Sequence, residues 1–169
     1  MSDILLPSGV HCILRHDLRP GDLGEILAIH GSLYKLECGF DITFEGYVAQ
    51  TLGHFARPYD AAKQRVWIVE RDDLFVACAG VIRHAHRVAQ LRWFLVVPEM
   101  RGNGLGTRLL QEALGFARTA GYTSMFLETV AELPAASRLY RAMGFVKTAE
   151  ASRRMWGREV TEQRYERQL

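Results

Sequence analysis

The chain has 169 residues, of which 49% are hydrophobic and 24% are charged, and its formal net charge is +2. This composition is typical of one globular domain spanning residues 1–169, and the net charge is too small to predict nucleic-acid binding. No apolar run approaches the ~20 residues of a membrane helix, and Met1–Gly9 lacks the apolar core of a secretion signal. Because Cys12, Cys38 and Cys78 include no C-x-x-C pair, we expect reduced, buried thiols in a cytoplasmic protein.

Regular structure is expected to begin with a strand at Val10–His16. A loop containing Pro and Gly follows it, and Asp22 with Glu25 has the spacing of an N-terminal helix cap. Apolar residues then recur every three or four positions from residue 23 to 34, which predicts an amphipathic helix. We interpret residues 35–40 as the linker to the next helix.

A second helix is predicted over Phe44–Phe55, with Asp41 or Thr43 as its N-cap. Pro58 ends this helix, because proline disfavours helical geometry in the residue before it. We interpret most of the aromatic residues of both helices as core packing. A strand is then expected at Val66–Glu70.

The next strand is predicted at Leu74–Arg83, and its weak polar alternation indicates burial on both faces. A short connection containing His84 and His86 leads to a further strand that begins at Val88. The two imidazoles would share one face of an extended chain, which is a spacing found in metal sites. Because no third ligand is evident nearby, we predict no metal site and interpret the histidines as surface groups or as neighbours of a bound substrate.

The stretch from Leu91 to Arg108 combines an apolar strand, a glycine-rich loop and the start of a helix. Pro98 closes the strand, because proline has no N–H to donate to a sheet. Three glycines then alternate along the loop: Gly102, Gly104 and Gly106. Glycines let backbone N–H groups approach a ligand, and the N-terminus of the amphipathic helix at residues 105–117 favours anions. Arg101 adds a permanent positive charge, so we expect a phosphorylated cofactor here.

Three kinds of phosphate-binding loop can be compared with this stretch. A Walker-type loop needs Lys and then Ser or Thr after its last glycine, an order that Leu105 and Thr107 do not provide. A dinucleotide fingerprint requires G-x-G-x-x-G directly after the strand, whereas this loop reads G-x-G-x-G. The remaining pattern, R-x-x-G-x-G at Arg101, Gly104 and Gly106, resembles the coenzyme A loop of the GCN5-related N-acetyltransferase (GNAT) family. That family splays its central strand to hold the pantetheine.

The rest of the chain is predicted to form a strand at Ser124–Val130, a helix at Pro134–Met143 and two closing strands at Phe145–Trp156 and Glu159–Leu169. Gly121 has the character of a helix C-cap before the first of these strands. The short β–α–β return indicates that Ser124–Val130 lies parallel to the strand that precedes the glycine loop.

A second motif strengthens the resemblance. The family commonly carries N-x-x-A-x-x-L-Y-x-x-x-G-F, and five positions match in register: Ala136, Leu139, Tyr140, Gly144 and Phe145. The likeness covers about the C-terminal two-thirds of the chain. It extends to the acetyltransferase half of bacterial proteins that carry a winged-helix regulator, although this chain shows no such regulator. On this resemblance we expect a bacterial protein.

The resemblance implies a single α/β domain with the acyl-CoA N-acyltransferase fold, in which helices flank a mixed, mostly antiparallel, twisted sheet. It implies direct transfer of an acetyl group from acetyl-CoA to a primary amine, with the first helices helping to form the acceptor site. The implied cofactor-binding residues lie on the central strand and the glycine loop: Leu95, Val96, Arg101, Gly102, Asn103, Gly104, Leu105, Gly106 and Thr107. Backbone N–H groups near the two strand residues would also hold the oxyanion.

Two catalytic residues are expected. Tyr140 matches the family position that returns a proton to the leaving thiolate, and an ordinary tyrosine pKa of ~10 keeps it protonated at neutral pH. Glu128 ends a strand beside the central one, so we predict that it takes a proton from the amine. A water chain could also serve as the base, and so could several further side chains: Glu37, Glu45, His84 and His86.

One position departs from the family pattern. Leu133 stands where the second motif has asparagine, and leucine cannot hydrogen-bond the cofactor as asparagine does. A non-catalytic acyl-CoA-sensing or partner-binding module is therefore the alternative function. The acceptor stays open between a small-molecule amine and a protein amine, other acyl-CoAs stay open as donors, and a homodimer through the C-terminal strands is implied by resemblance only.

Overall fold

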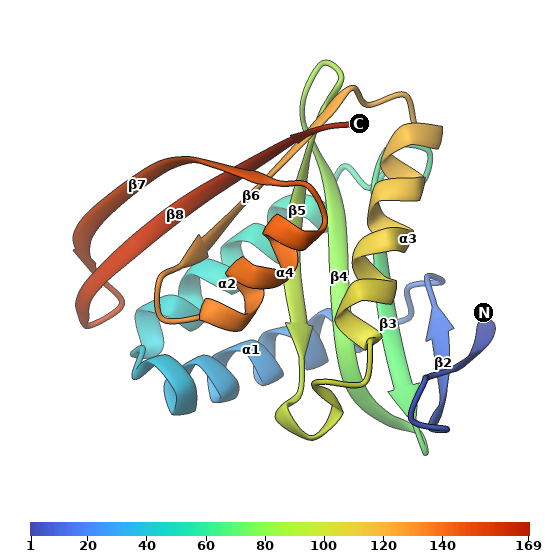
Figure 1. Cartoon of the computed structure of the whole chain (residues 1–169). Helices are drawn as coiled ribbons and strands as arrows, with labels where there is room; N and C mark the ends of the chain where they lie inside the picture. The colour runs from blue at the N-terminus through green and yellow to red at the C-terminus, as the bar shows by residue number, and fades with distance from the viewer.

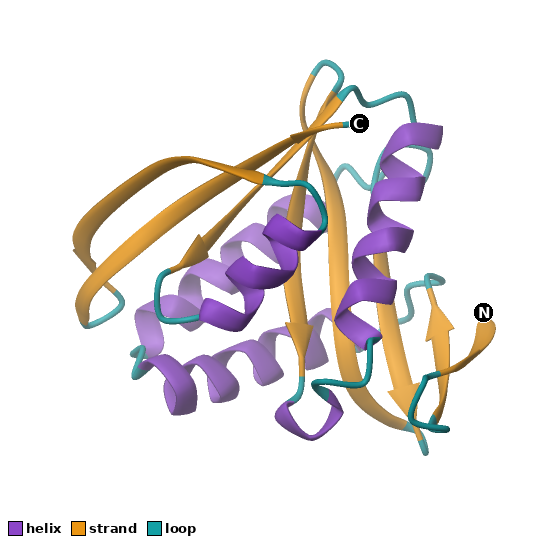
Figure 2. Cartoon of the chain, viewed as in Figure 1, coloured by secondary structure: helices purple, strands orange, loops and turns teal.

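The computed structural model describes residues 1–169 and contains one twisted eight-stranded sheet with helices on both faces (Figures 1 and 2). The strands are β1 (Ser2–Leu5), β2 (His11–Arg15), β3 (Arg65–Arg71), β4 (Leu74–Ala85), β5 (Val88–Val96), β6 (Ser124–Val130), β7 (Val146–Met155) and β8 (Arg158–Gln168). They follow the order β1-β2-β3-β4-β5-β6-β8-β7, and only the β5–β6 pair is parallel. The predicted mixed, mostly antiparallel sheet is confirmed.

Four helices cover the sheet: α1 (Asp22–Cys38), α2 (Ile42–Ala56), α3 (Leu105–Thr119) and α4 (Pro134–Ala142). A 3₁₀ turn at Pro98–Met100 precedes the glycine loop. Side chains of α1 and α2 share one buried cluster with the sheet, whereas those of α3 and α4 share the other. Amphipathic helices bury one stripe each in this way. In α3 the buried stripe contains Leu114 and five of the six predicted residues, whereas the sixth, Phe116, is only partly buried. None of the helices combines the length and hydropathy needed to cross a bilayer.

Three local expectations need correction. The strand β1 was not anticipated, and it pairs antiparallel with β2 from Ser2↔Leu14 to Leu5↔His11. Helix α1 continues through the residues expected to be a linker, and it ends where Gly39 adopts a left-handed conformation with φ 70°. Asp22 does not cap α1, because its carboxylate is held by another side chain instead. The predicted cap of α2 is confirmed, since Asp41 accepts the Thr43 backbone N–H at 2.9 Å.

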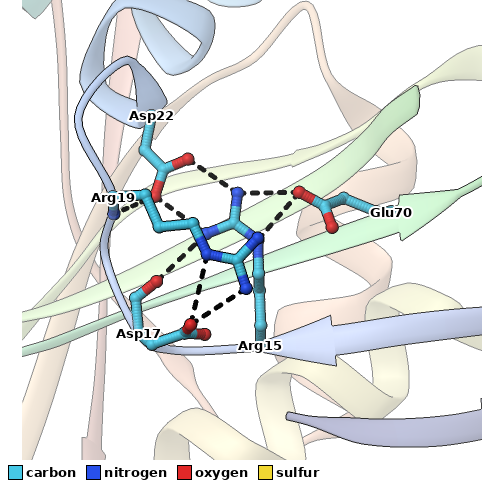
Figure 3. Close-up of polar contacts among 5 residues, drawn as sticks. All are labelled: Arg15, Asp17, Arg19, Asp22 and Glu70. Carbon is cyan, nitrogen blue, oxygen red and sulfur yellow. Dashed lines mark hydrogen bonds and ion pairs between the residues drawn. The ribbon is translucent and has the colours of Figure 1, made fainter. Parts of the chain in front are cut away.

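Asp22 belongs to a buried ion cluster that joins β2, β3 and the start of α1 (Figure 3). The Arg15 guanidinium donates to the two Asp22 oxygens at 2.8 and 2.6 Å and to Glu70 at 2.8 Å. The Arg19 backbone N–H donates to Asp22 at 2.6 Å. Burial acts to raise the pKa of Asp22, but the hydrogen bonds from Arg15 and Arg19 outweigh burial and leave that pKa below its ordinary value.

The three cysteines are buried and unpaired, as predicted. Burial raises the pKa of the Cys38 thiol to about 11 and also raises the pKa values of Cys12 and Cys78. A thiol with a raised pKa is a weak nucleophile at neutral pH, so these side chains serve the core.

The parallel strands β5 and β6 pair only near their starts, from Val88↔Ser124 to Gln90↔Phe126. Beyond that point the two strands diverge, which Figure 1 shows. A bulge bends β5 in the diverging part, because Cys78 and Gly80 of β4 face Leu95 and Arg92, leaving two residues of β5 opposite one of β4. The sheet therefore opens beside the C-terminal half of β5.

Candidate active site

The larger of two adjoining cavities has a volume of about 740 Å³ and lies where β5 diverges from β6. Seven of the nine predicted cofactor residues line this donor cleft: Leu95, Val96, Arg101, Gly102, Gly104, Gly106 and Thr107. The opposite walls come from α1, through Leu33, Tyr34 and Glu37, and from Glu132–Ala136 with Leu139. The side chains of Asn103 and Leu105 do not line the cleft, and that of Leu105 is buried in the core.

The glycine loop presents free backbone donors to the donor cleft. Gly104 is the N-cap of α3, has a φ of 80° and offers no side-chain cap. The first hydrogen bond of the helix runs from the Arg108 N–H to the Gly104 carbonyl at 3.0 Å, so the N–H groups of residues 105–107 precede the intrahelical ladder. A Cβ on Gly106 would lie 3.2 Å from Leu139 Cδ2. The loop therefore combines anion-binding N–H groups with a glycine that packs closely against Leu139.

Arg101 closes one end of the donor cleft through two contacts that the sequence did not predict. Its Nε donates to the Val96 carbonyl at 2.9 Å, and its Nη2 lies 2.7 Å from a Glu37 carboxylate oxygen. Glu37 is one of the side chains that the sequence allows as the base. The ion pair with Arg101 offsets the charge of the Glu37 carboxylate and holds that carboxylate at the donor cleft. This geometry does not favour Glu37 as the base.

The backbone of Val96 faces the donor cleft. Val97 donates its N–H to the Val76 carbonyl of β4 at 3.0 Å. Because successive residues of a strand direct their backbone groups to opposite sides, the N–H of Val96 points away from β4. The same alternation directs the N–H of Leu95 toward β4, so Val96 is the better placed of the two predicted oxyanion donors.

The smaller cavity has a volume of about 110 Å³ and adjoins the donor cleft, because Tyr34, Phe94, Leu133 and Ala136 line both. We call it the acceptor cavity. It contains both predicted catalytic residues, Tyr140 and Glu128. Side chains that the sequence analysis did not identify complete its polar and aromatic lining: His30, Gln90, Arg92, Trp156 and Glu162. They come from α1, β5, the β7–β8 turn and β8, and no sequence spacing connects them.

Tyr140 is held between aromatic rings and is only 5% exposed. Its ring centroid lies 5.8 Å from that of Phe94 and 6.1 Å from those of Phe145 and Tyr165. Burial raises the pKa of the Tyr140 hydroxyl, and the nearby Tyr34 adds to that rise. The phenol is therefore neutral at physiological pH and keeps its proton for donation.

Glu128 is the carboxylate of the acceptor cavity that is only loosely engaged. Gln90 Nε2 donates to it at 3.4 Å, and Arg164 Nη1 lies 3.8 Å away. Glu45, His84 and His86 line neither cavity. Glu45 packs near Gly31, and the His84 ring contacts Phe126 edge-on at 4.7 Å. No group of three or more His, Cys, Asp or Glu side chains has the geometry of a metal site.

His30 lies in the acceptor cavity as a neutral imidazole. Its Nδ1 hydrogen-bonds the Ile26 carbonyl at 2.8 Å, which leaves Nε2 as an acceptor. Burial lowers the pKa of His30 to about 4, and the charge of Arg92 acts in the same direction. The ring is therefore a hydrogen-bond acceptor of low basicity at neutral pH.

Comparison with known proteins agrees with this geometry. The model of the Acetyltransferase (GNAT) family matches residues 33–145. An uncharacterized N-acetyltransferase of Schizosaccharomyces pombe is 34% identical over 120 residues, which cover 69% of this chain and 72% of that protein. Member 5 of the mouse N-acetyltransferase family 8 is 32% identical over 118 residues, which cover 64% of this chain and 52% of the relative. This chain therefore spans about half the length of the mouse relative. Both relatives are eukaryotic, so they do not support the expected bacterial origin.

A solved structure shows the same fold. An acetyltransferase from Salmonella typhimurium, solved with its cofactor acetyl-CoA, has a TM-score of 0.71 and 20% sequence identity to this chain. The match covers 94% of each chain. At this identity the likeness establishes the fold, and the expected single-domain architecture with helices flanking the sheet is confirmed.

Proposed function

Because this chain belongs to the GNAT acetyltransferase family, we propose that residues 1–169 form one domain that transfers an acetyl group from acetyl-CoA to a primary amine. The observation that carries the proposal is that the donor cleft adjoins the acceptor cavity, which is lined by Tyr140 and Glu128. A thioester where the two meet would lie near an attacking amine, an acid and a base.

The residues of the donor cleft fit coenzyme A. The free N–H groups before the Arg108 N–H, together with Arg101, suit a pyrophosphate. Gly106 also lines the donor cleft, so no side chain at this position narrows the cleft. Val96 offers a backbone N–H to an amide or to an oxyanion. Leu133 and Leu139 form an apolar wall of the donor cleft. Leu133 therefore offers apolar packing where the asparagine of the motif offers a hydrogen bond. When bound, the cofactor supplies an acyl group activated as a thioester.

Tyr140 and Glu128 carry the proton transfers in this proposal. The amine nitrogen attacks the carbonyl carbon, the carbon–sulfur bond breaks, and the amine proton passes to Glu128. Tyr140 donates its proton to the departing sulfur, and its phenol carries that proton at physiological pH because burial raises its pKa. The His30 imidazole has little affinity for a proton, because burial lowers its pKa to about 4.

The cellular location and the oligomeric state also belong to this proposal. A cytoplasmic location is supported by three buried cysteines that form no disulfide. A homodimer stays a proposal from the resemblance, and the exposed outer strand β7 is the edge that would carry it. The matched relatives are N-acetyltransferases by name and supply no support for a winged-helix fusion.

A non-catalytic acyl-CoA sensor is the second candidate. Two observations favour it: Leu133 removes a motif hydrogen bond, and Glu37 neutralises Arg101 at the donor cleft. A sensor would bind CoA and acetyl-CoA without acetylating any amine. The enzyme hypothesis is preferred because both Tyr140 and Glu128 line the same cavity.

Calorimetric titration of the protein with CoA, acetyl-CoA and NAD tests the donor site. We expect micromolar binding of both CoA forms, no NAD binding, and loss of CoA binding in Gly104→Trp. Gly115→Trp is the matched control, because Gly115 is exposed on α3 with open space around it. A folded wild-type protein that binds no CoA would refute the proposal, whereas CoA binding without turnover on any amine would favour the sensor.

A further inference from the structure

Arg92 places an unpaired guanidinium in the wall of the acceptor cavity. It lies on β5, it is half-buried, and it lines the same cavity as Tyr140 and Glu128. Its Cζ lies 5.2 Å from the centroid of the Tyr47 ring and 5.9 Å from that of Trp93. Apart from these contacts with aromatic rings, the Arg92 guanidinium takes part in no ion pair or hydrogen bond with the protein. The guanidinium edge therefore keeps its donors for a ligand.

The other titratable groups of the acceptor cavity do not neutralise Arg92. Glu162 is paired with Arg153 at 2.5 Å. Glu128 is approached by Gln90 and by Arg164, while burial keeps His30 neutral. The cavity thus presents the Arg92 guanidinium, which forms an ion pair with none of these groups, and the carboxyl group of Glu128.

We propose that the acceptor carries a carboxylate beside its primary amine, and that Arg92 binds this carboxylate. The planar guanidinium fork matches a carboxylate with two parallel hydrogen bonds, and flanking rings that stack on it fix its plane. The amine of the same molecule then meets Glu128. This inference rests on the proposed function and narrows its acceptor to free amino acids and their side-chain derivatives.

The same features select against other amines. A polyamine would bring a second positive charge into the cavity that holds Arg92, and like charges in a half-buried site disfavour binding. A peptide N-terminus or a protein lysine has an uncharged amide where the inference requires a carboxylate. The volume of about 110 Å³ also suits a compact acceptor.

Matched pairs of acceptors test the inference. The nineteen free amino acids that carry a primary amine and their α-amides are compared by following the release of CoA thiol from acetyl-CoA. For the best acceptors, kcat/KM of the acid should exceed that of its amide by about 10- to 150-fold, the range of a charge-assisted hydrogen bond. The amide has the less basic amine and hence more of its reactive neutral form, so this chemical bias works against the expected preference.

Variants of Arg92 test whether this side chain causes the preference for the acid over its amide. Arg92→Gln should remove the acid-over-amide ratio, chiefly by raising KM for the acid, and should leave the amide nearly unchanged. Arg92→Lys keeps the charge without the fork and should retain part of the ratio. Arg118→Gln is the control, because Arg118 is exposed on α3 and outside both cavities; it should keep the wild-type ratio.

Several results would overturn the inference. Equal use of acids and amides by the wild type, a ratio that survives in Arg92→Gln, or CoA binding without acetylation of any amino acid would each do so. Turnover of amines that lack a carboxylate, with no preference for the acid over its amide, would leave the proposed acetyltransferase function intact. Failure to bind CoA in the calorimetric titration would instead refute the proposed function itself, so the two failures are distinguishable.

Discussion

The bulge that bends β5 into the site requires a glycine at position 80. A Cβ on Gly80 would lie 2.6 Å from Trp93 Cε3 and 3.0 Å from Cζ3, which is too close for carbon atoms, so the indole would have to move. Trp93 is only 6% exposed, its Nε1 donates to Thr51 at 3.2 Å, and its ring packs on Phe55 with centroids 5.3 Å apart. Moving the indole would disturb these contacts together with the bulge.

We therefore predict that Gly80→Ala lowers the free energy of unfolding by about 1–3 kcal/mol, the usual cost of overpacking a core. With a urea m-value of about 2 kcal/mol per molar, the unfolding midpoint should fall by about 0.5–1.5 M. Because Trp93 lines the acceptor cavity, kcat/KM for the acceptor should also fall. CoA affinity should change less, since Trp93 is absent from the lining of the donor cleft.

Gly115→Ala is the matched control for this experiment. Gly115 lies in α3, is exposed, and has open space where a Cβ would be placed. Alanine is the better helix former, so this variant should gain about 0.5–1 kcal/mol. If Gly80→Ala unfolds at the wild-type urea concentration while the control behaves as expected, the packing argument for the bulge is wrong.

Two more predictions concern single side chains. Tyr140→Phe should lower kcat for acetyl transfer and leave the calorimetric Kd of CoA unchanged; an unchanged kcat would remove Tyr140 as the acid. Asp22→Asn should lower the free energy of unfolding by about 3 kcal/mol at pH 7, because it leaves the buried Arg15 without its main partner. The native pKa of Asp22 is depressed, so its stabilisation is present above the unfolded pKa of ~3.9 and is lost as pH falls through the native pKa. Urea titrations from pH 7 to pH 2 should show the deficit shrinking below about pH 4, and a constant deficit would contradict this.

The elements that could be predicted from the sequence are those with local causes. The apolar stripe of α3 repeats at helical spacing, and the predicted helix is present over Leu105–Thr119. The strand β1 has no such pattern, and the structure forms it by pairing four residues with β2. Asp22 has the spacing of a helix cap, yet Arg15, seven residues earlier in the chain, binds it more strongly. In both cases a partner outside the pattern itself decided the structure, and the spacing of capping or apolar residues does not reveal such a partner.

The two halves of the site differ in the same way. In the proposed function the glycine loop binds through backbone groups of one continuous stretch, so its glycines are visible as a motif. The acceptor cavity is assembled from side chains of separate elements, such as His30 of α1, Arg92 of β5 and Trp156 of the β7–β8 turn. Besides Tyr140 and Glu128, the trace of this cavity in the sequence is a charged residue inside the apolar run from Leu91 to Val96.

That charge is informative because the fold does not need it. A leucine at position 92 could pack against the Tyr47 ring without the desolvation cost of a half-buried guanidinium that has no counter-charge. The buried Arg15, by comparison, is enclosed by the carboxylates of Asp22 and Glu70. In the acceptor cavity neither Glu128 nor Glu162 forms an ion pair with Arg92, and under our inference the acceptor supplies the carboxylate.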